Sequence, residues 1–537
     1  MRFKALLFFL LVSGLWPVHA SAHNRFIVRD TAGFDALQQA CVPLGCTVVS
    51  SIDGPQNQNQ VFLVTAPRNI DPALILAALL NVPGVTNAEL DQSVALIPAL
   101  PQAPAIPAGL SDTSVVQYFG ASVRNGYVNQ PAAQIVRVSE AQNTFQVAGV
   151  GIVADIDTGV DPNHPALQGV LLPGWDFTRN QAGGSEMTDL QFSSSPPPSC
   201  DQCQAVFVNQ STAAVLDQST AAVLDGNPQY AAFGHGTMVM GVIHLVAPQA
   251  KLLPLKAFQS DGTGFLSDIL SAIYFAVQNQ ASVINMSFDL KTQSDELSKA
   301  LDFANQQDVI CTASAGNDGV MEIVYPAAIQ NDVMGVASTS DLDQRSTFSN
   351  FGDAIVWVAA PGEAIISTYP FGSYGAAWGT SFSSPFVAGA AALLLDQKPG
   401  TDESQAASAV AHAVPVGPDM GNGRLDLVQA LTANGAQPGD FYIAGAQQAI
   451  KIHRGQTQTF TFKVTAFDGF AGTVNFSVTG LPLNIDADFN PSSRAGSGNS
   501  VLTLHAHRNA HPGSYNLTVT GKSGVLVHSV GFEVHVQ

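Results

Sequence analysis

The chain has 537 residues, which is too long for one ordinary hydrophobic core and predicts roughly three or four structural units. Its composition, 46% hydrophobic and only 12% charged, excludes global disorder. A formal net charge of -20 excludes simple nucleic-acid binding, because phosphate groups would be repelled and the sequence has no basic run to offset the acidity.

The first 22 residues have the pattern of a secretory signal peptide. Arg2 and Lys4 precede an apolar stretch over residues 5–16, and Ala20 and Ala22 then place small residues two apart at a cleavage site. A membrane anchor is the competing interpretation, but this stretch is shorter than the ~20 apolar residues of a spanning helix. We therefore expect residues 1–22 to be removed from a secreted, extracellular protein with no membrane span.

Residues 23–97 predict a small unit with the order βαββαβ, a ferredoxin-like arrangement. Strands are expected at residues 25–29, near 48, at 61–64 and at 85–90, and helices at residues 34–40 and 72–80. Residues 98–109 follow as a linker with four prolines within ten residues. This composition predicts an extended, exposed strip that is easily cut.

Residues 110–434 alternate short apolar runs with amphipathic helical segments. The apolar runs lie at residues 150–156, 251–258, 283–286, 309–313 and 333–337. This alternation predicts an α/β fold, a parallel sheet with helices on both faces, whose functional residues lie at the carboxyl ends of strands. The segment at residues 385–395 is almost wholly apolar and predicts a helix buried in the middle of the domain.

Residues 438–537 have a different texture, with apolar residues at every second position between clusters of Gly, Pro, Asn and Ser. About seven such strands predict an all-β, immunoglobulin-like sandwich. This part of the sequence has no motif that carries chemistry, so we interpret it as a spacer or a weak binding module.

Five cysteines cannot all pair within one chain. Cys41 and Cys46 could close one local loop, and Cys200 and Cys203 another. Cys311 lies in an apolar run and is expected to be a small buried hydrophobic residue.

Three glycine-containing segments present an acid, a base and a nucleophile. They are D-T-G at residues 157–159, G-H-G-T at residues 234–237 and G-T-S-F-S-S-P at residues 379–385. The order Asp, His, Ser is that of subtilisin rather than of chymotrypsin or the α/β-hydrolases. The chain therefore resembles the subtilisin-like serine peptidases over residues 110–434, and residues 23–97 resemble, more loosely, the inhibitor-like propeptide of secreted members. The perfect tandem octamer at residues 210–225 lies between the first two motifs, and we assign it no catalytic role.

The resemblance implies a catalytic triad of Asp157, His235 and Ser381. Ser381 would attack the scissile carbonyl, His235 would take its proton, and Asp157 would orient the imidazole and stabilise its cation. Asn317, in the segment A-S-A-G-N at residues 313–317, would form the oxyanion hole with the backbone N–H of Ser381.

The resemblance also implies two strands that flank an extended peptide, at residues 261–266 and 284–288. Phe265 and Phe288 indicate either an apolar substrate preference or simple packing. The implied substrate-binding residues are Gly262, Gly264, Ser287, Phe288, Ser314 and Gly316.

Two residues depart from the family pattern. Asp289 stands where the family usually has glycine after a substrate strand, which leaves the shape of the pocket open. Asp155 replaces the usual apolar residue two positions before Asp157, and a carboxylate on a central strand is costly unless it is paired or wetted.

Taken together, these features predict a secreted serine endopeptidase made as a self-processed precursor. Its expected partners are polypeptide substrates and its own propeptide, which would act as an intramolecular inhibitor. We expect no required cofactor and no metal among the site residues. Related enzymes often bind calcium, but the sequence has no ligand run of EF-hand spacing to indicate it. One alternative is a catalytically silent secreted binding protein that acts through its C-terminal sandwich. Another is acyl hydrolysis of a tripeptide-releasing or ester-directed kind, which would use the same catalytic residues.

Overall fold

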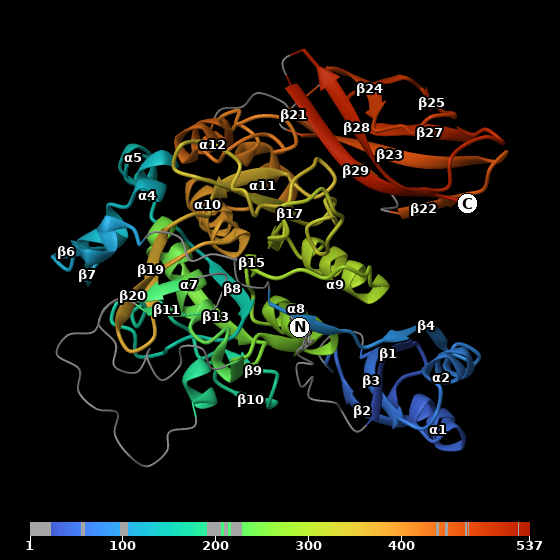
Figure 1. Ribbon diagram of the computed structural model, residues 1–537, viewed down its shortest axis with the longest axis horizontal. Helices are drawn as coiled ribbons and strands as arrows, with labels where there is room; N and C mark the ends of the chain where they lie inside the picture. The colour runs from blue at the N-terminus through green and yellow to red at the C-terminus, as the bar shows by residue number, and fades with distance from the viewer. Residues whose placement is uncertain are drawn as a thin grey trace, which may run out of the picture. The chain divides into compact units, whose positions relative to one another are not determined.

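The computed structural model describes residues 23–54, 59–96, 106–190, 206–208, 213–215, 228–435, 440–445, 449–467, 470, 472–524 and 526–537 (Figure 1). The expected signal peptide, the Cys200–Cys203 pair, most of the tandem octamer and most of the proline-rich linker lie outside these residues. The chain divides into two compact units, residues 1–91 and 92–537.

The N-terminal unit has the element order βαββαβ. Its strands form one antiparallel sheet in the order β2-β3-β1-β4. Cys41 and Cys46 are buried free thiols in the core of this unit. The elements are β1 (His23–Asp30), α1 (Phe34–Leu44), β2 (Thr47–Ser51), β3 (Val61–Pro67), α2 (Pro72–Leu79) and β4 (Val85–Leu90).

The second unit begins with an α/β region built on an eight-stranded sheet of order β10-β9-β13-β8-β15-β16-β17-β18. The strands from β13 to β18 in this order are parallel, as the alternating apolar runs predict. Cys311 is fully buried on β16, as expected. The strands are β8 (Ile152–Asp157), β9 (Trp175–Asp176), β10 (Gln181–Ala182), β13 (Lys251–Lys256), β15 (Val283–Met286), β16 (Ile310–Ser314), β17 (Met334–Thr339) and β18 (Val358–Pro361).

Helices α7 and α10 pack against each other and against the sheet, and so do α8 and α9. Every residue of α10 from Ser384 to Leu394 is buried, which confirms the expected central helix. It begins directly after a 3-10 turn, η4 (Thr380–Phe382). The helices of this region are α3 (Asn125–Val128), α4 (Pro131–Ile135), α5 (Val138–Phe145), α7 (His235–Val246), α8 (Leu266–Gln278), α9 (Asp295–Asn305), α10 (Ser384–Gln397), α11 (Glu403–Val410) and α12 (Leu427–Gly435).

Short elements beside the main sheet complete the α/β region. A four-stranded sheet has the order β11-β12-β20-β19, and two strand pairs join β14 to β5 and β6 to β7. The elements are β5 (Ser93–Ala95), η1 (Ala108–Ser111), β6 (Val115–Tyr118), β7 (Ala121–Arg124), η2 (Glu186–Asp189), β11 (Val206–Val208), β12 (Ala213–Val215), η3 (Pro228–Tyr230), β14 (Thr263–Phe265), β19 (Ile365–Tyr369) and β20 (Ser373–Ala377).

The C-terminal region is all strand and is drawn in orange to red in Figure 1. Its described residues form nine strands, two more than the pattern suggested, in sheets β21-β23-β27-β25 and β22-β29-β28-β24-β26. Every second residue of β27 is buried, because one face of the strand lines a core shared by both sheets. The strands are β21 (Asp440–Gly445), β22 (Ala449–Ile452), β23 (Thr457–Phe467), β24 (Thr473–Thr479), β25 (Ile485–Asn490), β26 (Ser493–Ala495), β27 (Gly498–Ala506), β28 (Gly513–Ser523) and β29 (Leu526–Val536).

Within the part of the chain that the structure describes, no helix has the length and apolar character needed to cross a bilayer.

Candidate active site

Asp157 is the last residue of β8, which lies between β13 and β15 in the parallel sheet. Its side chain is buried, and the backbone N–H of Thr158 donates a 2.6 Å hydrogen bond to its Oδ1. Gly159 follows with φ of +100°, and a Cβ there would lie 2.6 Å from the carbonyl oxygen of Gly184. The tight turn after Asp157 therefore requires glycine.

His235 is the first residue of α7, and its Nδ1 lies 2.8 Å from each carboxylate oxygen of Asp157. An ionised carboxylate only accepts hydrogen bonds, so Nδ1 carries the proton and Nε2 is left as the acceptor. Nε2 is buried and has no hydrogen-bond partner among the described residues. This is the tautomer and the free lone pair that a general base needs.

Ser381 lies in the η4 turn, one residue before Phe382, whose ring packs against that of His235 at 5.4 Å. Its hydroxyl donates a 3.2 Å hydrogen bond to the backbone carbonyl of Ser287. The hydroxyl of Ser287 donates in return to the carbonyl of Ser381 at 2.9 Å. These two bonds fix the serine turn against the segment that follows β15. The Ser381 hydroxyl is thus held by Ser287, and catalytic hydrogen bonds often form only when substrate binds.

Asn317 follows β16 and turns its Oδ1 toward Thr380. The backbone N–H and the hydroxyl of Thr380 donate to that oxygen at 2.9 and 2.8 Å. Because both donors face Oδ1, the NH₂ group of Asn317 points the other way and stays available as a donor. Thr380 therefore orients Asn317 from the position next to Ser381. Sequence reasoning gave Thr380 no role, although its place in the serine motif was a signal.

The remaining predicted residues come from two segments and from β16. Gly264 lies on β14, where a Cβ would meet the carbonyl oxygen of Ala257 at 2.6 Å. The hydroxyl of Ser314 donates to the carbonyl of Phe288 at 3.3 Å, which ties β16 to the segment after β15. Gly262 and Gly316 both have positive φ, of +85° and +98°.

The surroundings of Phe288 show whether its ring contacts substrate or packs in the core. Its side chain is fully buried and packs against Phe258 with ring centroids 5.3 Å apart. The ring therefore serves the core of the domain, and it gives no support to an apolar substrate preference.

An extended segment of the chain itself lies along β14. Strand β5 pairs with β14 in antiparallel register, with Val94 opposite Gly264. The pairing continues at both ends, because Leu96 N–H donates to the carbonyl of Gly262 at 2.8 Å and Leu266 N–H donates to that of Gln92 at 2.9 Å. Strand β14 can thus hold an extended peptide by backbone hydrogen bonds.

Asp155 is buried on β8, directly opposite Asn285 of β15. Its Oδ1 accepts a 2.9 Å hydrogen bond from the Asn285 amide, which also donates to the Ser287 hydroxyl at 3.0 Å. Burial, and then the negative charge of Asp157, raise the pKa of Asp155 well above its ordinary value. Oδ1 of the atypical carboxyl group is therefore paired, while Oδ2 is buried and has no hydrogen-bond partner among the described residues, so the pairing offsets only part of the cost of a carboxyl group on a central strand.

Asp289 directly follows the segment at residues 284–288, and its Oδ2 is 3.2 Å from the position that a Cβ on Gly316 would occupy. Burial and the nearby Asp318 raise its pKa to about 6, against the charge of Lys291. Lys291 itself bonds Asp318 at 2.9 Å and Glu322 at 3.1 Å.

Glu186, on η2, is a buried acid that sequence reasoning missed. Its carboxyl group is fully buried and contacts residues next to both Asp157 and His235. No sequence motif surrounds it.

Among the described residues, no group of three or more His, Cys, Asp or Glu side chains is placed to hold a metal ion.

Comparison with known proteins places this sequence in a family. The sequence pattern of the Subtilase family matches residues 150–446. Thermitase of Thermoactinomyces vulgaris is 32% identical over 272 residues, which cover 50% of this chain and 82% of thermitase. Subtilisin NAT of Bacillus subtilis subsp. natto is 38% identical over 266 residues, which cover 47% of this chain and 57% of that protein.

Among solved structures, the crystal structure of a cold adapted subtilisin-like serine proteinase aligns with 52% of this chain and 90% of its own, at 28% identity and a TM-score of 0.41. The family match covers more than half of the 537 residues, and thermitase is matched over most of its length. The chain belongs to the subtilase family, and its enzyme class is that of the subtilisin-like serine endopeptidases.

Proposed function

We propose that the protein is a secreted serine endopeptidase that cleaves peptide bonds through Asp157, His235 and Ser381 and is made as a self-processed precursor. The observation that carries this proposal is the buried Asp157–His235 pair, whose Nδ1 is bonded at 2.8 Å while Nε2 is left free. The serine turn lies beside it, within ring contact of His235 through Phe382.

In the proposed reaction, Ser381 Oγ turns from the Ser287 carbonyl toward Nε2 of His235, which takes the hydroxyl proton as Oγ attacks the scissile carbonyl carbon. Asp157 stabilises the imidazolium that forms. The negative oxygen of the tetrahedral intermediate accepts hydrogen bonds from the Asn317 amide and the Ser381 N–H. His235 then protonates the leaving amine, and a water molecule activated by the same residue releases the acyl group from Ser381.

The substrate class follows from β14. A peptide that adds to this strand receives backbone hydrogen bonds whatever its sequence, and pockets for alternate side chains supply selectivity. The pairing of Ser93–Ala95 with β14 supports two parts of the proposal. It illustrates how a polypeptide substrate would lie, and it favours the N-terminal segment of this chain as an intramolecular inhibitor that fills the same strand position. We infer that residues 23–97 are this inhibitor-like propeptide and that the cut falls after β5.

The strand-rich C-terminal region is proposed to be an immunoglobulin-like module carried by the secreted enzyme. Residues 1–22 are proposed to direct secretion, in keeping with their signal-peptide pattern.

The test compares secreted wild type with Ser381→Ala, and with Ser298→Ala as a matched control. Ser298 lies on α9 and its hydroxyl donates to the carbonyl of Ser294 within that helix turn. The measurements are the mass of the secreted chain over time and the hydrolysis of a fluorescent protein substrate with and without a serine-directed phosphonylating inhibitor. We expect wild type and Ser298→Ala to shorten from the N-terminus and to become active, and Ser381→Ala to stay full length with roughly 10⁶-fold lower kcat.

If wild type and Ser381→Ala both stay full length and inert, the peptidase proposal is wrong. The alternative, a catalytically silent binding protein that acts through its C-terminal sandwich, would then be preferred. Adding calcium over a range of pH in the same assay tests whether an ion is needed for activity.

A further inference from the structure

Glu186 carries an acidic side chain into the interior of the α/β region. It begins the short turn η2, 48 residues before Gly234 in the chain, and it is fully buried. A buried carboxyl group is costly unless its oxygens accept hydrogen bonds. Both oxygens of Glu186 accept hydrogen bonds, and the identity of the donors indicates the role of the residue.

The donors to Glu186 come from both sides of the catalytic pair. On the Asp157 side, the hydroxyl of Thr158 donates to Oε2 at 3.1 Å. On the His235 side, the N–H of Gly234 donates to the same oxygen at 2.7 Å, and the hydroxyl of Thr237 donates to Oε1. Each partner lies within two residues of Asp157 or His235, so one side chain connects the two segments that carry them.

Thr158 and Thr237 also connect the Asp157 and His235 segments through a second set of hydrogen bonds. The N–H of Gly236 donates to the Thr158 hydroxyl at 3.0 Å, and the N–H of Asp161 donates to the Thr237 hydroxyl at 2.7 Å. Each hydroxyl therefore accepts from the opposite segment while it donates to Glu186. Without the carboxyl group, both hydroxyl protons would lose their acceptor in a buried site.

The turn that holds Glu186 is itself fixed. Its backbone N–H donates to the carbonyl of Val160 at 3.1 Å, and Lys256 bonds both Asp189 on the same turn, at 2.8 Å, and the Thr158 carbonyl, at 2.9 Å. Burial raises the pKa of Glu186 to about 8, against the hydrogen bonds from Thr237 and Gly234 and the charge of Lys256. The residue thus lies on a rigid support rather than on a free loop.

We propose that Glu186 is a positioning residue for the catalytic pair, one that holds the loop after Asp157 to the first turn of α7 so that the Asp157 carboxylate faces Nδ1 of His235. The proposal rests on the triad function proposed above. The hydrogen bonds of the Glu186 carboxyl group go to Thr158, Gly234 and Thr237, and neither the Ser381 turn nor β14 supplies one of these donors. Its removal therefore changes the alignment of acid and base and leaves the peptide strand intact.

The test uses Glu186→Ala and Glu186→Gln in the secreted, processed enzyme. Active sites are counted by titration with a phosphonylating reagent, so that kcat is expressed per reactive serine. Misplacing a catalytic group by about 1 Å costs up to ~10²-fold, so we expect Glu186→Ala to lower kcat about 10- to 100-fold, with KM changed less than about threefold. Glu186→Gln keeps an oxygen for Gly234 and Thr158, and we expect a loss of only about three- to tenfold, because one hydrogen bond is disturbed.

The pH profile separates positioning from simple loss of stability. If Asp157 no longer faces His235, the imidazolium is less stabilised, and the acid limb of kcat/KM moves to lower pH in both variants. Glu403→Gln and Glu403→Ala are the matched controls, because Glu403 is also a buried glutamate that accepts from a backbone N–H, that of Cys311 at 2.9 Å. They are expected to reduce stability while leaving kcat per active site and the acid limb unchanged.

The outcomes are distinguishable. If wild type does not react with the phosphonylating reagent, the proposed function is wrong and this inference falls with it. If wild type reacts and both Glu186 variants keep wild-type kcat per site and an unmoved acid limb, only the positioning role is overturned. Should Glu186→Ala fail to be secreted, Glu186→Gln alone decides by the same two readouts.

Discussion

Two buried acids of the α/β region, Asp155 and Glu186, accept hydrogen bonds from neutral donors, whereas the buried acid Asp440 of the two-sheet C-terminal region has a histidine partner. Burial raises the pKa of Asp155 and of Glu186. Burial would raise the pKa of Asp440 as well, but hydrogen bonds from His528, Ser408 and its own segment outweigh it and lower that pKa.

The two regions therefore use buried polarity differently. In the α/β region, buried polar side chains gather at the carboxyl ends of β8, β15 and β16, where the proposed chemistry takes place. Among the described residues from 440 onward, the buried polar side chains are Asp440, Ser500 and His528, and the rest of the core is apolar. We expect substitutions of the polar residues at these strand ends to change activity, and substitutions of apolar core residues in the C-terminal region to change stability alone.

Among the substitutions that compare the two regions, the largest effect is expected in the apolar core of the C-terminal region. Phe532 is buried on β29, with its ring 5.7 Å from those of Phe460 and Phe462. Phe532→Ala should lower the free energy of unfolding by about 3–5 kcal/mol, through lost burial and a cavity. Urea denaturation of the Ser381→Ala background, which avoids self-digestion, measures this value.

The control for Phe532→Ala is Val527→Ala, which truncates a side chain that is 43% exposed on the same strand. It should have little effect on stability. A drop in kcat per active site caused by Phe532→Ala in the processed enzyme would contradict the separation of the two regions.

The second largest effect is expected at Asn317, the proposed oxyanion donor. Asn317→Leu removes the amide that Thr380 orients, and should lower kcat by roughly 10²- to 10³-fold with little change in KM, the magnitude known for a subtilisin that loses its oxyanion asparagine. Steady-state kinetics on a peptide substrate, with urea denaturation alongside, should show the loss in kcat without a comparable loss of stability. A change confined to KM would place Asn317 in substrate binding instead.

Much of the fold and site could be predicted from the sequence because the signals are local. Apolar runs and glycines mark the ends of strands, so Asp157 at the end of β8 and the buried helix α10 were predictable. The pairing of Asp155 with Asn285 depends on the register of β8 and β15, because these two hydrogen-bonded residues lie 130 positions apart in the chain. Register is set by the folded sheet rather than by either strand alone.

Glu186 shows the limit of sequence reasoning more clearly. It forms a hydrogen bond with Thr237, 51 residues further along the chain. No periodicity or motif in the sequence indicates that a glutamate in this loop lies next to the catalytic pair. The strand count of the C-terminal region was underestimated for a related reason. Short strands such as β26 are defined by their partners, and three residues carry too little alternation to predict a strand.

The smallest effect concerns the buried pair formed by Asp440 and His528. Asp440 Oδ1 lies 2.9 Å from His528 Nε2, and its Oδ2 accepts from the Ser408 hydroxyl at 2.6 Å. The ring of His528 also stacks on Trp357 at 6.1 Å, so the pair joins the C-terminal strands to the α/β region. Asp440→Asn replaces one acceptor oxygen by a donor, and should cost about 1–3 kcal/mol of unfolding free energy at pH 7.

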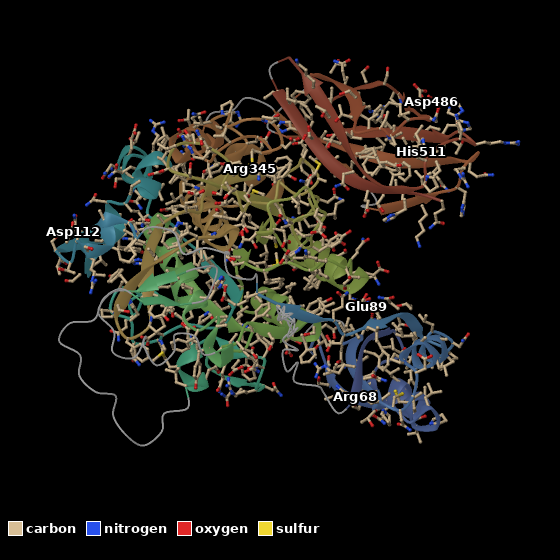
Figure 2. The ribbon with its side chains drawn as sticks, in the orientation of Figure 1. Arg68, Glu89, Asp112, Arg345, Asp486 and His511 are labelled. Carbon is tan, nitrogen blue, oxygen red and sulfur yellow. The ribbon has the colours of Figure 1, made fainter. Side chains whose placement is uncertain are left out.

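The matched control is a second Asp–His pair of similar length on the surface. It is formed by Asp486, which is labelled in Figure 2. Asp486 Oδ2 lies 2.7 Å from His507 Nε2, and the two side chains are 75% and 44% exposed. Asp486→Asn should leave stability unchanged, because exposed ion pairs contribute little.

The pH dependence of stability shows whether the Asp440 charge stabilises or destabilises the fold. The pKa of Asp440 is lower in the folded state than the ordinary value of 3.8, so its contribution is present above pH 3.8 and is lost as the pH falls through the folded pKa. Unfolding curves between pH 2 and 7 should show wild type and Asp440→Asn converging at the acid end, and a constant gap between them would mean that the Asp440 charge does not stabilise the fold.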